Sequence, residues 1–244
     1  MTRSILFVAV AAAALLSAPA AMANSVLFSE DFTGQLDEGL FGEINAGDSF
    51  TATNGQWTIS FAEDSASVDS EGAAVQDNIG TFDPFPTASA QLPGGEHFQW
   101  FEPEGPGVFR TMAVDITGFT DLTFSFDYFE IGRWDSADTS LASYSIDGGV
   151  TFNKIFNRNG ETGGGSGSSD ATQSLALETF SFAMSGGTSF IFSATVNTSA
   201  SSEIAGLDNI LLTGTAPAPI PLPASALLLL GGLAALPVMR RRRG

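Results

Sequence analysis

Large apolar side chains recur at every second position through most of this chain, and that alternation limits the folds it can adopt. In one segment Leu122, Phe124 and Phe126 alternate with Thr123 and Ser125. Successive side chains point to opposite faces of a β-strand, so a period of two predicts strands with one buried and one solvated face. The segments with this pattern or with strand composition are 56–61, 108–116, 122–128, 141–146, 179–184, 189–196 and 204–212.

These segments show no helical period, and glycines and short polar turns separate them. The sequence therefore predicts an all-β fold, a jelly-roll-like antiparallel β-sandwich, whose core draws on 21 phenylalanines. About 190 residues remain between the two ends of the chain, enough to bury roughly 70% of the surface of the unfolded chain. The chain has no cysteine, and a domain of this size can fold without disulfides.

The start of the chain has the organisation of a secretory signal peptide. Arg3 supplies a positive charge, 5–16 is an unbroken apolar run, and the Ala-Met-Ala of 21–23 is a small-residue cleavage site. We therefore expect the exported protein to begin at Asn24. The alternative is an uncleaved anchor, which the short apolar run disfavours because a spanning helix needs about 20 residues.

Acidic residues are concentrated in the middle of the chain. Residues 24–214 hold all 27 acidic residues but only four of the nine basic ones, a formal net charge of −23. The four basic residues are Arg110, Arg133, Lys154 and Arg158. A surface of this sign repels nucleic acid and attracts cations, so we expect no nucleic-acid partner. Solubility and calcium binding remain as two interpretations of the charge.

The C-terminal segment combines a proline motif, an apolar run and a basic end. The motif is Ile220, Pro221, Leu222, Pro223 and Ala224, and the basic end is Arg240, Arg241, Arg242 and Arg243. As a helix, the run from 224 to 239 would span about 24 Å, slightly less than a hydrocarbon core of roughly 30 Å. The arginines would hold the C-terminus in the cytoplasm and leave the preceding domain outside.

This tail resembles the PEP-CTERM class of sorting signals in the variant written VPLPA, with Ile220 in place of the leading valine. In that family exosortases, which are membrane-embedded cysteine proteases, recognise the tails of proteins exported alongside extracellular polysaccharide. The resemblance implies an exosortase-like processing enzyme as a partner. It also implies anchoring in the inner membrane through the C-terminal helix before processing, and then a location at the cell surface or outside the cell. A plain anchor and a sortase signal are the alternatives.

One segment of the domain carries a turn motif. The run 145–152 reads S-I-D-G-G-V-T-F, and its Asp147-Gly148-Gly149 predicts a tight hairpin between two strands. The run also resembles the Asp-box of sialidase-type propellers, in which the aspartate ties down the turn and the aromatic residue packs below it. The motif occurs once, which argues against a propeller, and the resemblance implies a structural role.

Calcium is the cofactor that the acidic residues favour, because it binds carboxylate and carbonyl oxygens. The domain resembles jelly-roll carbohydrate-binding modules, many of which hold a structural calcium with acids from the first and last strands. That resemblance implies Glu30 and Asp31 from the first strand, and Asp208 and Asn209 from the last, as ligands. Ordinary exposed acids are the alternative interpretation. The loop at 135–138 is a second candidate metal site.

Few residues are candidates for sugar binding or catalysis. Trp100 and Trp134 are the candidate aromatic platforms for a polysaccharide, whereas Trp57 alternates like a core residue. His97 is the one histidine, so no pair of histidines can bind a metal or serve a reaction. The sequence contains no H-E-x-x-H, P-loop or G-x-S-x-G motif. Carboxylate pairs arise by chance among 27 acids and indicate no active site.

We therefore predict four regions with separate roles. They are a signal peptide at 1–23, a β-sandwich domain at 24–214, a proline-rich linker and sorting motif at 215–223, and a transmembrane sorting helix with its arginine cluster at 224–244. The predicted function is that of an exported, non-enzymatic surface or matrix protein associated with exopolysaccharide. A calcium-dependent carbohydrate-binding module and a glycoside hydrolase are the alternatives.

Overall fold

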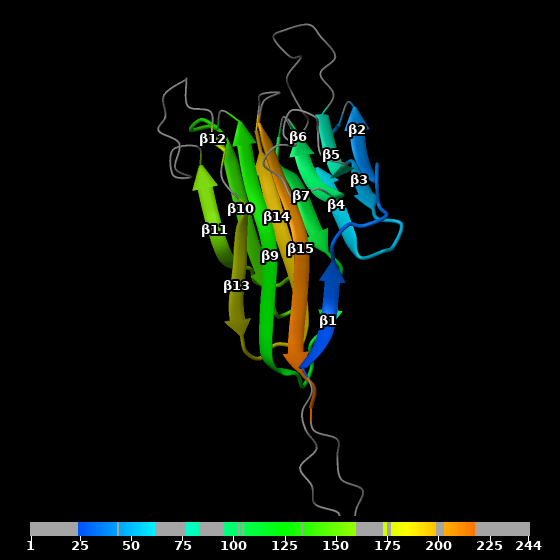
Figure 1. Ribbon diagram of the computed structural model, residues 1–244, viewed down its shortest axis with the longest axis vertical. Coiled ribbons are helices and arrows are strands. Elements are labelled where there is room, and N and C mark those ends of the chain that lie inside the picture. The colour runs from blue at the N-terminus through cyan, green and yellow to red at the C-terminus, as the bar shows by residue number, and fades with distance from the viewer. Residues whose placement is uncertain are drawn as a thin grey trace, which may run out of the picture. The chain divides into compact units, whose positions relative to one another are not determined.

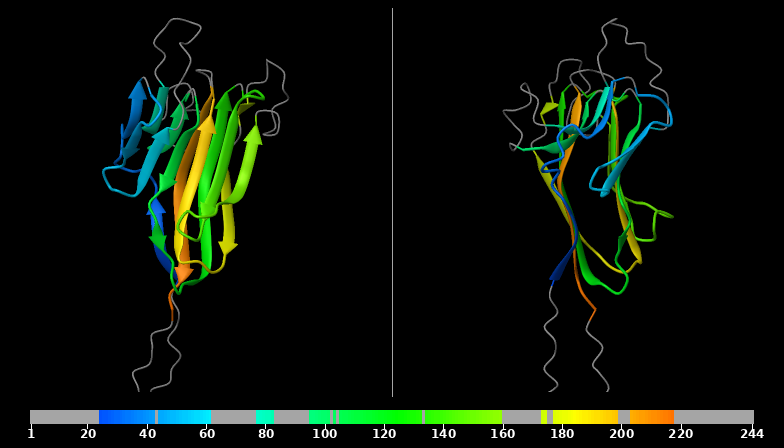
Figure 2. Two further views of the ribbon diagram at one scale, coloured as in Figure 1. Left: turned by 180° about the vertical axis from the view of Figure 1, so that it is seen from behind. Right: turned by 90° about the vertical axis from the view of Figure 1, so that its right-hand side faces the viewer.

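Two antiparallel β-sheets face one another in the computed structural model of the protein (Figures 1 and 2). The structure describes 24–42, 44–61, 77–82, 95–101, 103, 105–132, 134–159, 173–174, 177–198 and 203–217. The expected signal peptide and the sorting motif with its helix and arginines lie outside these residues. Within the described residues there is no helix long and apolar enough to cross a membrane.

The first sheet, sheet A, has eight strands. Its order is β12-β9-β15-β6-β5-β2, with β1 beside β15 and β13 beside β9 (Figure 1). The strands are β1 (Asn24–Glu30), β2 (Gly39–Gly42), β5 (Asp77–Phe82), β6 (His97–Phe101), β9 (Thr120–Gly132), β12 (Gln173–Ser174), β13 (Glu178–Met184) and β15 (Ile204–Thr215). The two longest strands, β9 and β15, pair along most of their length and form the centre of the sheet.

The second sheet, sheet B, has seven strands in the order β11-β10-β14-β7-β4-β3, with β8 beside β14. The strands are β3 (Ser49–Thr51), β4 (Trp57–Phe61), β7 (Gly107–Thr111), β8 (Val114–Asp115), β10 (Thr139–Ser145), β11 (Asn153–Asn159) and β14 (Ser189–Asn197). The right-hand view of Figure 2 shows the two sheets edge-on, one behind the other.

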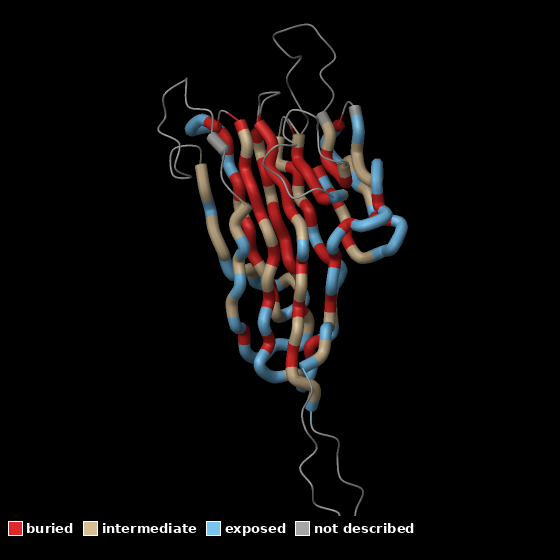
Figure 3. The backbone as a smooth tube through the Cα atoms, in the orientation of Figure 1, coloured by how far each residue is buried: buried red, intermediate tan, exposed pale blue. Residues whose placement is uncertain are grey.

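Aromatic rings from both sheets meet in the core. The ring centroid of Phe98 on β6 lies 4.8 Å from that of Phe109 on β7 and 5.3 Å from that of Trp57 on β4. Further along, Phe124 on β9 lies 4.8 Å from Phe190 on β14. All five side chains are fully buried, and Figure 3 shows that buried residues run most continuously through the upper half of the central strands in that view. Trp57 is a core residue, as its alternation predicts.

The predicted fold class, a jelly-roll-like antiparallel β-sandwich, is confirmed. Each expected segment lies on strand, but 108–116 is divided between β7 and β8, because β7 pairs with both β4 and β14 whereas β8 pairs only with β14. The sequence pattern did not indicate β6, whose first four residues are all buried. A strand buried on both faces has no polar alternation to reveal it.

The described domain begins and ends at the same end of the sandwich. Asn24, the first residue of β1, pairs with Thr215, the last residue of β15. We call this end the tail pole; it is the lower end in Figure 1. Residues 24–216 form one compact unit.

Candidate functional site

Glu30, a predicted calcium ligand, lies at the end of β1 and is buried. Its carboxylate accepts hydrogen bonds from the Phe32 N–H at 2.8 Å, the Gln35 side-chain amide at 2.6 Å and the Asn54 side-chain amide at 2.8 Å. Gln35 in turn accepts a hydrogen bond from the Trp57 indole N–H at 2.8 Å. Glu30 therefore ties the end of β1 to sheet B through protein donors.

Asp208, the second predicted ligand, lies beside Asp127 in the register of β15 and β9. Partial burial raises the pKa of Asp208 to about 6, and the nearby charges of Asp127, Asp31 and Glu30 act in the same direction, against a hydrogen bond from the Asn209 N–H. Asn209 adopts a left-handed φ of 50° at an irregularity in the β15 register. Its side-chain amide donates to Asp127 at 2.8 Å and to Asp208 at 3.3 Å.

The structure thus brings the predicted acids Glu30, Asp31 and Asp208 into one neighbourhood and adds Asp127, which the sequence pattern did not single out. The sequence feature that could have identified Asp127 is its position on the polar face of β9. Asp31 lies one residue beyond β1 and is exposed. Among the described side chains, however, no three His, Cys, Asp or Glu residues converge closely enough to hold a metal ion. The charges of these acids act on Asp208, but their side chains do not form a preformed ligand set.

In the second candidate metal site, the loop at 135–138, the two aspartates hydrogen-bond to backbone groups of the loop itself. The Asp138 carboxylate accepts a hydrogen bond from the Asp135 N–H, and the Asp135 carboxylate accepts one from the Ala137 N–H at 2.7 Å. Both carboxylates therefore stabilise the turn before β10.

The two predicted sugar platforms are wrong, because neither tryptophan presents an exposed ring. Trp100 is fully buried, and its indole N–H donates to the Gly107 carbonyl at 2.9 Å. Trp134 is 5% exposed and donates to the Ile131 carbonyl at 3.1 Å. Trp100 lies on β6, which is buried on both faces, and Trp134 lies between β9 and β10; in both places the large apolar ring is stabilised by burial. Among the described residues, the exposed aromatic side chain is that of Phe41, which is 44% exposed and which the pattern did not reveal.

The one histidine serves packing. His97 is 3% exposed, and its ring lies edge-on against Phe129 at 5.4 Å. One ring nitrogen contacts the Gly95 carbonyl at 3.1 Å, and the other contacts the Gln99 amide.

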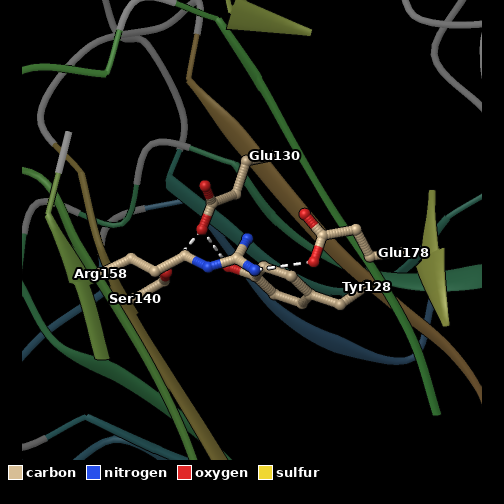
Figure 4. A network of polar contacts seen from close by, with 5 residues as sticks. All are labelled: Tyr128, Glu130, Ser140, Arg158 and Glu178. Atoms are coloured by element: carbon tan, nitrogen blue, oxygen red, sulfur yellow. Dashed lines mark hydrogen bonds and ion pairs between the residues drawn. The ribbon is translucent and has the colours of Figure 1, made fainter. Parts of the chain in front are cut away.

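A second buried carboxyl group, Glu130, lies between the sheets (Figure 4). It accepts hydrogen bonds from the Tyr128 hydroxyl at 3.0 Å and from the Ser140 hydroxyl across the core. Burial raises the pKa of Glu130, and the charge of Glu178 acts in the same direction, against the two hydrogen bonds and Arg158. A carboxyl group with a raised pKa is the chemical requirement for a general acid.

Arg158 and Glu178 lie beside this group. Their side chains form an ion pair at 2.7 Å, and the guanidinium lies over the Phe156 ring at 4.7 Å. Glu130 itself is only 2% exposed, so substrate has no access to it in this arrangement. The geometry favours a role for Glu130 in joining the two sheets.

Asp147 ties down its turn as the motif implies, but β10 and β11 are joined by residues 146–152 rather than by the tight hairpin that the sequence predicts. The Asp147 carboxylate accepts hydrogen bonds from the Ser145 hydroxyl at 2.7 Å, from the N–H groups of Val150 and Thr151 at 3.1 and 3.0 Å, and from the Thr151 hydroxyl. These donors lower the pKa of Asp147. Gly148 and Gly149 take left-handed φ angles of 79° and 92°, which other residues rarely adopt.

No protein-family model matches the chain, and no curated protein matches it. Among solved structures, the chain is similar to the K3 adhesin domain of Lys-gingipain from Porphyromonas gingivalis, with 13% identity, 78% and 99% of the two chains covered and a TM-score of 0.40. The chain is also similar to the CBM22-1 xylan-binding domain of Paenibacillus barcinonensis Xyn10C, with 12% identity, 82% of this chain and 100% of that chain covered, and a TM-score of 0.33. It is similar to TmCBM61 in complex with beta-1,4-galactotriose, with 9% identity, 64% of this chain and 86% of that chain covered, and a TM-score of 0.34. Likeness at these TM-scores carries no argument about function.

The buried Glu130 carboxyl group predicts how the stability of the domain depends on pH. Because the folded pKa is raised, the stability that protonated Glu130 contributes is present below the unfolded value of about 4.3 and is lost as pH rises through the folded value. Glu130→Gln cannot ionise, so its stability relative to the parent should be greater at pH 8 than at pH 4. Glu130→Ala should cost about 1–3 kcal/mol, because it leaves the Tyr128 and Ser140 hydroxyls without their acceptor.

Urea unfolding at the two pH values measures both effects. Glu178→Gln is the matched control, because it removes a partly exposed carboxylate of the same group, and it should change stability by less than about 1 kcal/mol. An equal difference between Glu130→Gln and the parent at both pH values would contradict the assignment.

Proposed function

We propose that the protein is an exported, non-enzymatic surface or matrix protein, sorted by an exosortase-like enzyme through its C-terminal segment, that associates with extracellular polysaccharide. The pairing of Asn24 with Thr215 is the observation that carries this proposal. The expected signal-peptide cleavage lies immediately before Asn24, and the expected linker begins at Thr215. Both processing sites would therefore lie at the tail pole, outside the paired strands.

This arrangement suits a domain that is held at one point and binds elsewhere. Cleavage at the tail pole removes no residue from the core, so the sandwich can remain folded before and after sorting. The buried position of Glu130 supports a binding role over hydrolysis, since a glycosidase needs two carboxyl groups that reach the substrate.

Sorting through the tail is tested by substitution. Pro221→Ala with Pro223→Ala should leave unprocessed protein in the membrane fraction, and replacement of Arg240, Arg241, Arg242 and Arg243 by serine should do the same. The control is Pro217→Ala with Pro219→Ala, which alters the linker outside the motif. Cell fractionation and immunoblotting measure how much of each variant is processed. Normal processing of both motif variants would show that the tail is only a membrane anchor.

Polysaccharide binding is tested with the full chain purified in mild detergent. Native gels that contain dextran, xylan, galactan or polygalacturonate should show retardation by at least one polymer, relative to a gel without polymer and to an unrelated acidic protein. Failure of every polymer to retard the protein would contradict the proposed association.

We also propose that calcium binds at the acidic cluster around Asp208. The support is electrostatic: four carboxylates lie near one another, and their repulsion contributes to the raised pKa of Asp208. The carboxylate oxygens of Glu30, Asp31, Asp127 and Asp208 are the type of ligand that calcium prefers. Binding would require the side chains to reorient, since they do not converge as they stand.

Calcium should therefore raise the melting temperature more than magnesium or sodium at equal ionic strength. An ion that binds only the folded state adds about 2.7 kcal/mol at one hundred times its dissociation constant. Because Asp208 with a pKa of about 6 ionises at a cost to the folded state, stability without calcium should fall as pH rises through 6, and the calcium effect should be larger at pH 7.5 than at pH 5.

Asp208→Asn should lose most of the calcium response. The matched control is Asp37→Asn, which removes one charge at an exposed left-handed position where asparagine is equally tolerated. If Asp208→Asn responds to calcium as the parent does, the cluster is not the site.

A further inference from the structure

Charge is divided unequally between the two sheets. The strands of sheet A contain no lysine or arginine, and their acids include Glu30, Asp127, Glu178 and Asp208. The six strands in the main path of sheet B contain no aspartate or glutamate, and three basic residues lie on them. Those three are Arg110, Lys154 and Arg158. In so acidic a domain, this segregation makes sheet B the surface most favourable to an anion.

Two of these cations lie in one row across sheet B. Arg110 on β7 pairs with Ser193 on β14, Ser193 pairs with Ser143 on β10, and Ser143 pairs with Lys154 on β11. Residues paired across a sheet share a face. Phe109 and Phe192, the neighbours of Arg110 and Ser193 in sequence, are fully buried in the core, so the row is on the outer face.

Both cations of the row are exposed, and neither has a carboxylate partner among the residues that the structure describes. Among the described residues the one ion pair joins Arg158 to Glu178, so neither Arg110 nor Lys154 is neutralised by a carboxylate there. The guanidinium of Arg110 lies 5.2 Å from the ring centroid of Phe152, which holds it over the sheet. An unpaired cation is unexpected where acids outnumber bases so strongly, and two in one row indicate a binding surface.

The residues around the cations can hydrogen-bond to sugars. The neighbouring row of the outer face places Thr195 of β14 and Asn157 of β11 on either side of Leu141. Ser143 and Ser193, the paired residues between the two cations, have short side chains that project little from the sheet. Three strand spacings of about 4.8 Å, roughly 14 Å, separate the backbones of Arg110 and Lys154. The Arg110 side chain narrows this gap, because its guanidinium lies over Phe152, two residues before Lys154.

The acidity of the rest of the domain does not prevent this. The two sheets of a sandwich lie about 10 Å apart, and the Debye length at physiological ionic strength is about 8 Å. An anion at the outer face of sheet B is therefore screened from most of the charge of sheet A. The acids nearest in sequence are engaged: Asp115 accepts a hydrogen bond from the Thr117 N–H at 2.9 Å, and Asp147 closes its own turn.

We propose that the outer face of sheet B binds an acidic polysaccharide, with Arg110 and Lys154 pairing with successive carboxylates along the polymer and the intervening residues hydrogen-bonding to its hydroxyl groups. This deepens the proposed function and rests on it. A second copy of the chain, docking the acids of its sheet A on this row, is the competing partner. The glycan is favoured because the four paired residues of the row, Arg110, Ser193, Ser143 and Lys154, are all polar, whereas the centre of a stable protein interface is apolar.

The test uses the full chain in mild detergent with EDTA, so that calcium takes no part. In affinity electrophoresis polygalacturonate, a polymer of uronic acid, should retard the protein, and dextran, which is uncharged, should not. Arg110→Gln and Lys154→Gln should each weaken binding to polygalacturonate by at least about tenfold, the loss expected for one charge-assisted contact. Salt should weaken binding in the parent and less so in the variants.

Ser181→Asp is the matched control. It makes the same change in net charge on an exposed position of sheet A and should bind like the parent. Circular dichroism checks that each variant is folded.

The outcomes are distinguishable. Equal binding by parent and both variants would overturn the site but leave polysaccharide association intact. Retardation by dextran alone would overturn the preference for acidic polymers and again leave the association intact. Binding to no polymer would overturn both proposals. A dimer in size-exclusion chromatography that Arg110→Gln dissociates would assign the row to a second copy of the chain and overturn the glycan proposal.

Discussion

The contact between aromatic rings of opposite sheets is the interaction on which the rest of the structure depends. Phe98 of sheet A lies within 5.3 Å of Trp57 and 4.8 Å of Phe109 in sheet B, measured between ring centroids. Each such pair adds about 0.5–1.5 kcal/mol beyond the area it buries. Without disulfides, and with strong repulsion among its acids, the domain relies on this dense apolar core to hold the sheets together.

Two buried carboxyl groups extend this contact between the sheets. Glu30 links β1 to β4 through Gln35 and Trp57, and Glu130 links β9 to β10 through Ser140. Each carboxyl has its hydrogen bonds satisfied by protein donors, which offsets the cost of removing it from water. Glu30, which the sequence predicts as a metal ligand, and Glu130, whose raised pKa the structure shows, therefore act as structural links in the folded domain.

Outside the core, the acidic side chains of the strands lie mainly on sheet A and the basic ones on sheet B. Acids lie on sheet A, where Asp127 and Asp208 crowd one another, and the outer face of sheet B carries Arg110 and Lys154. Asp127 and Asp208 thus lie on one sheet and these two cations on the other, although the protein as a whole is strongly acidic. Asn24 and Thr215, the first residue of β1 and the last residue of β15, lie together at the tail pole.

The sequence by itself determined the strand faces, the class of fold and the turn at Asp147, because these depend on contacts between residues close together in the chain. Leu122, Phe124 and Phe126 alternate with polar residues whatever the rest of the chain does. Only the tertiary structure decided that Trp100 is buried, that Asp127 joins Asp208, and that Arg110 and Lys154 share a row. Those outcomes depend on which strands become neighbours and in what register, and that choice is made by the packing of the whole core rather than by any local pattern.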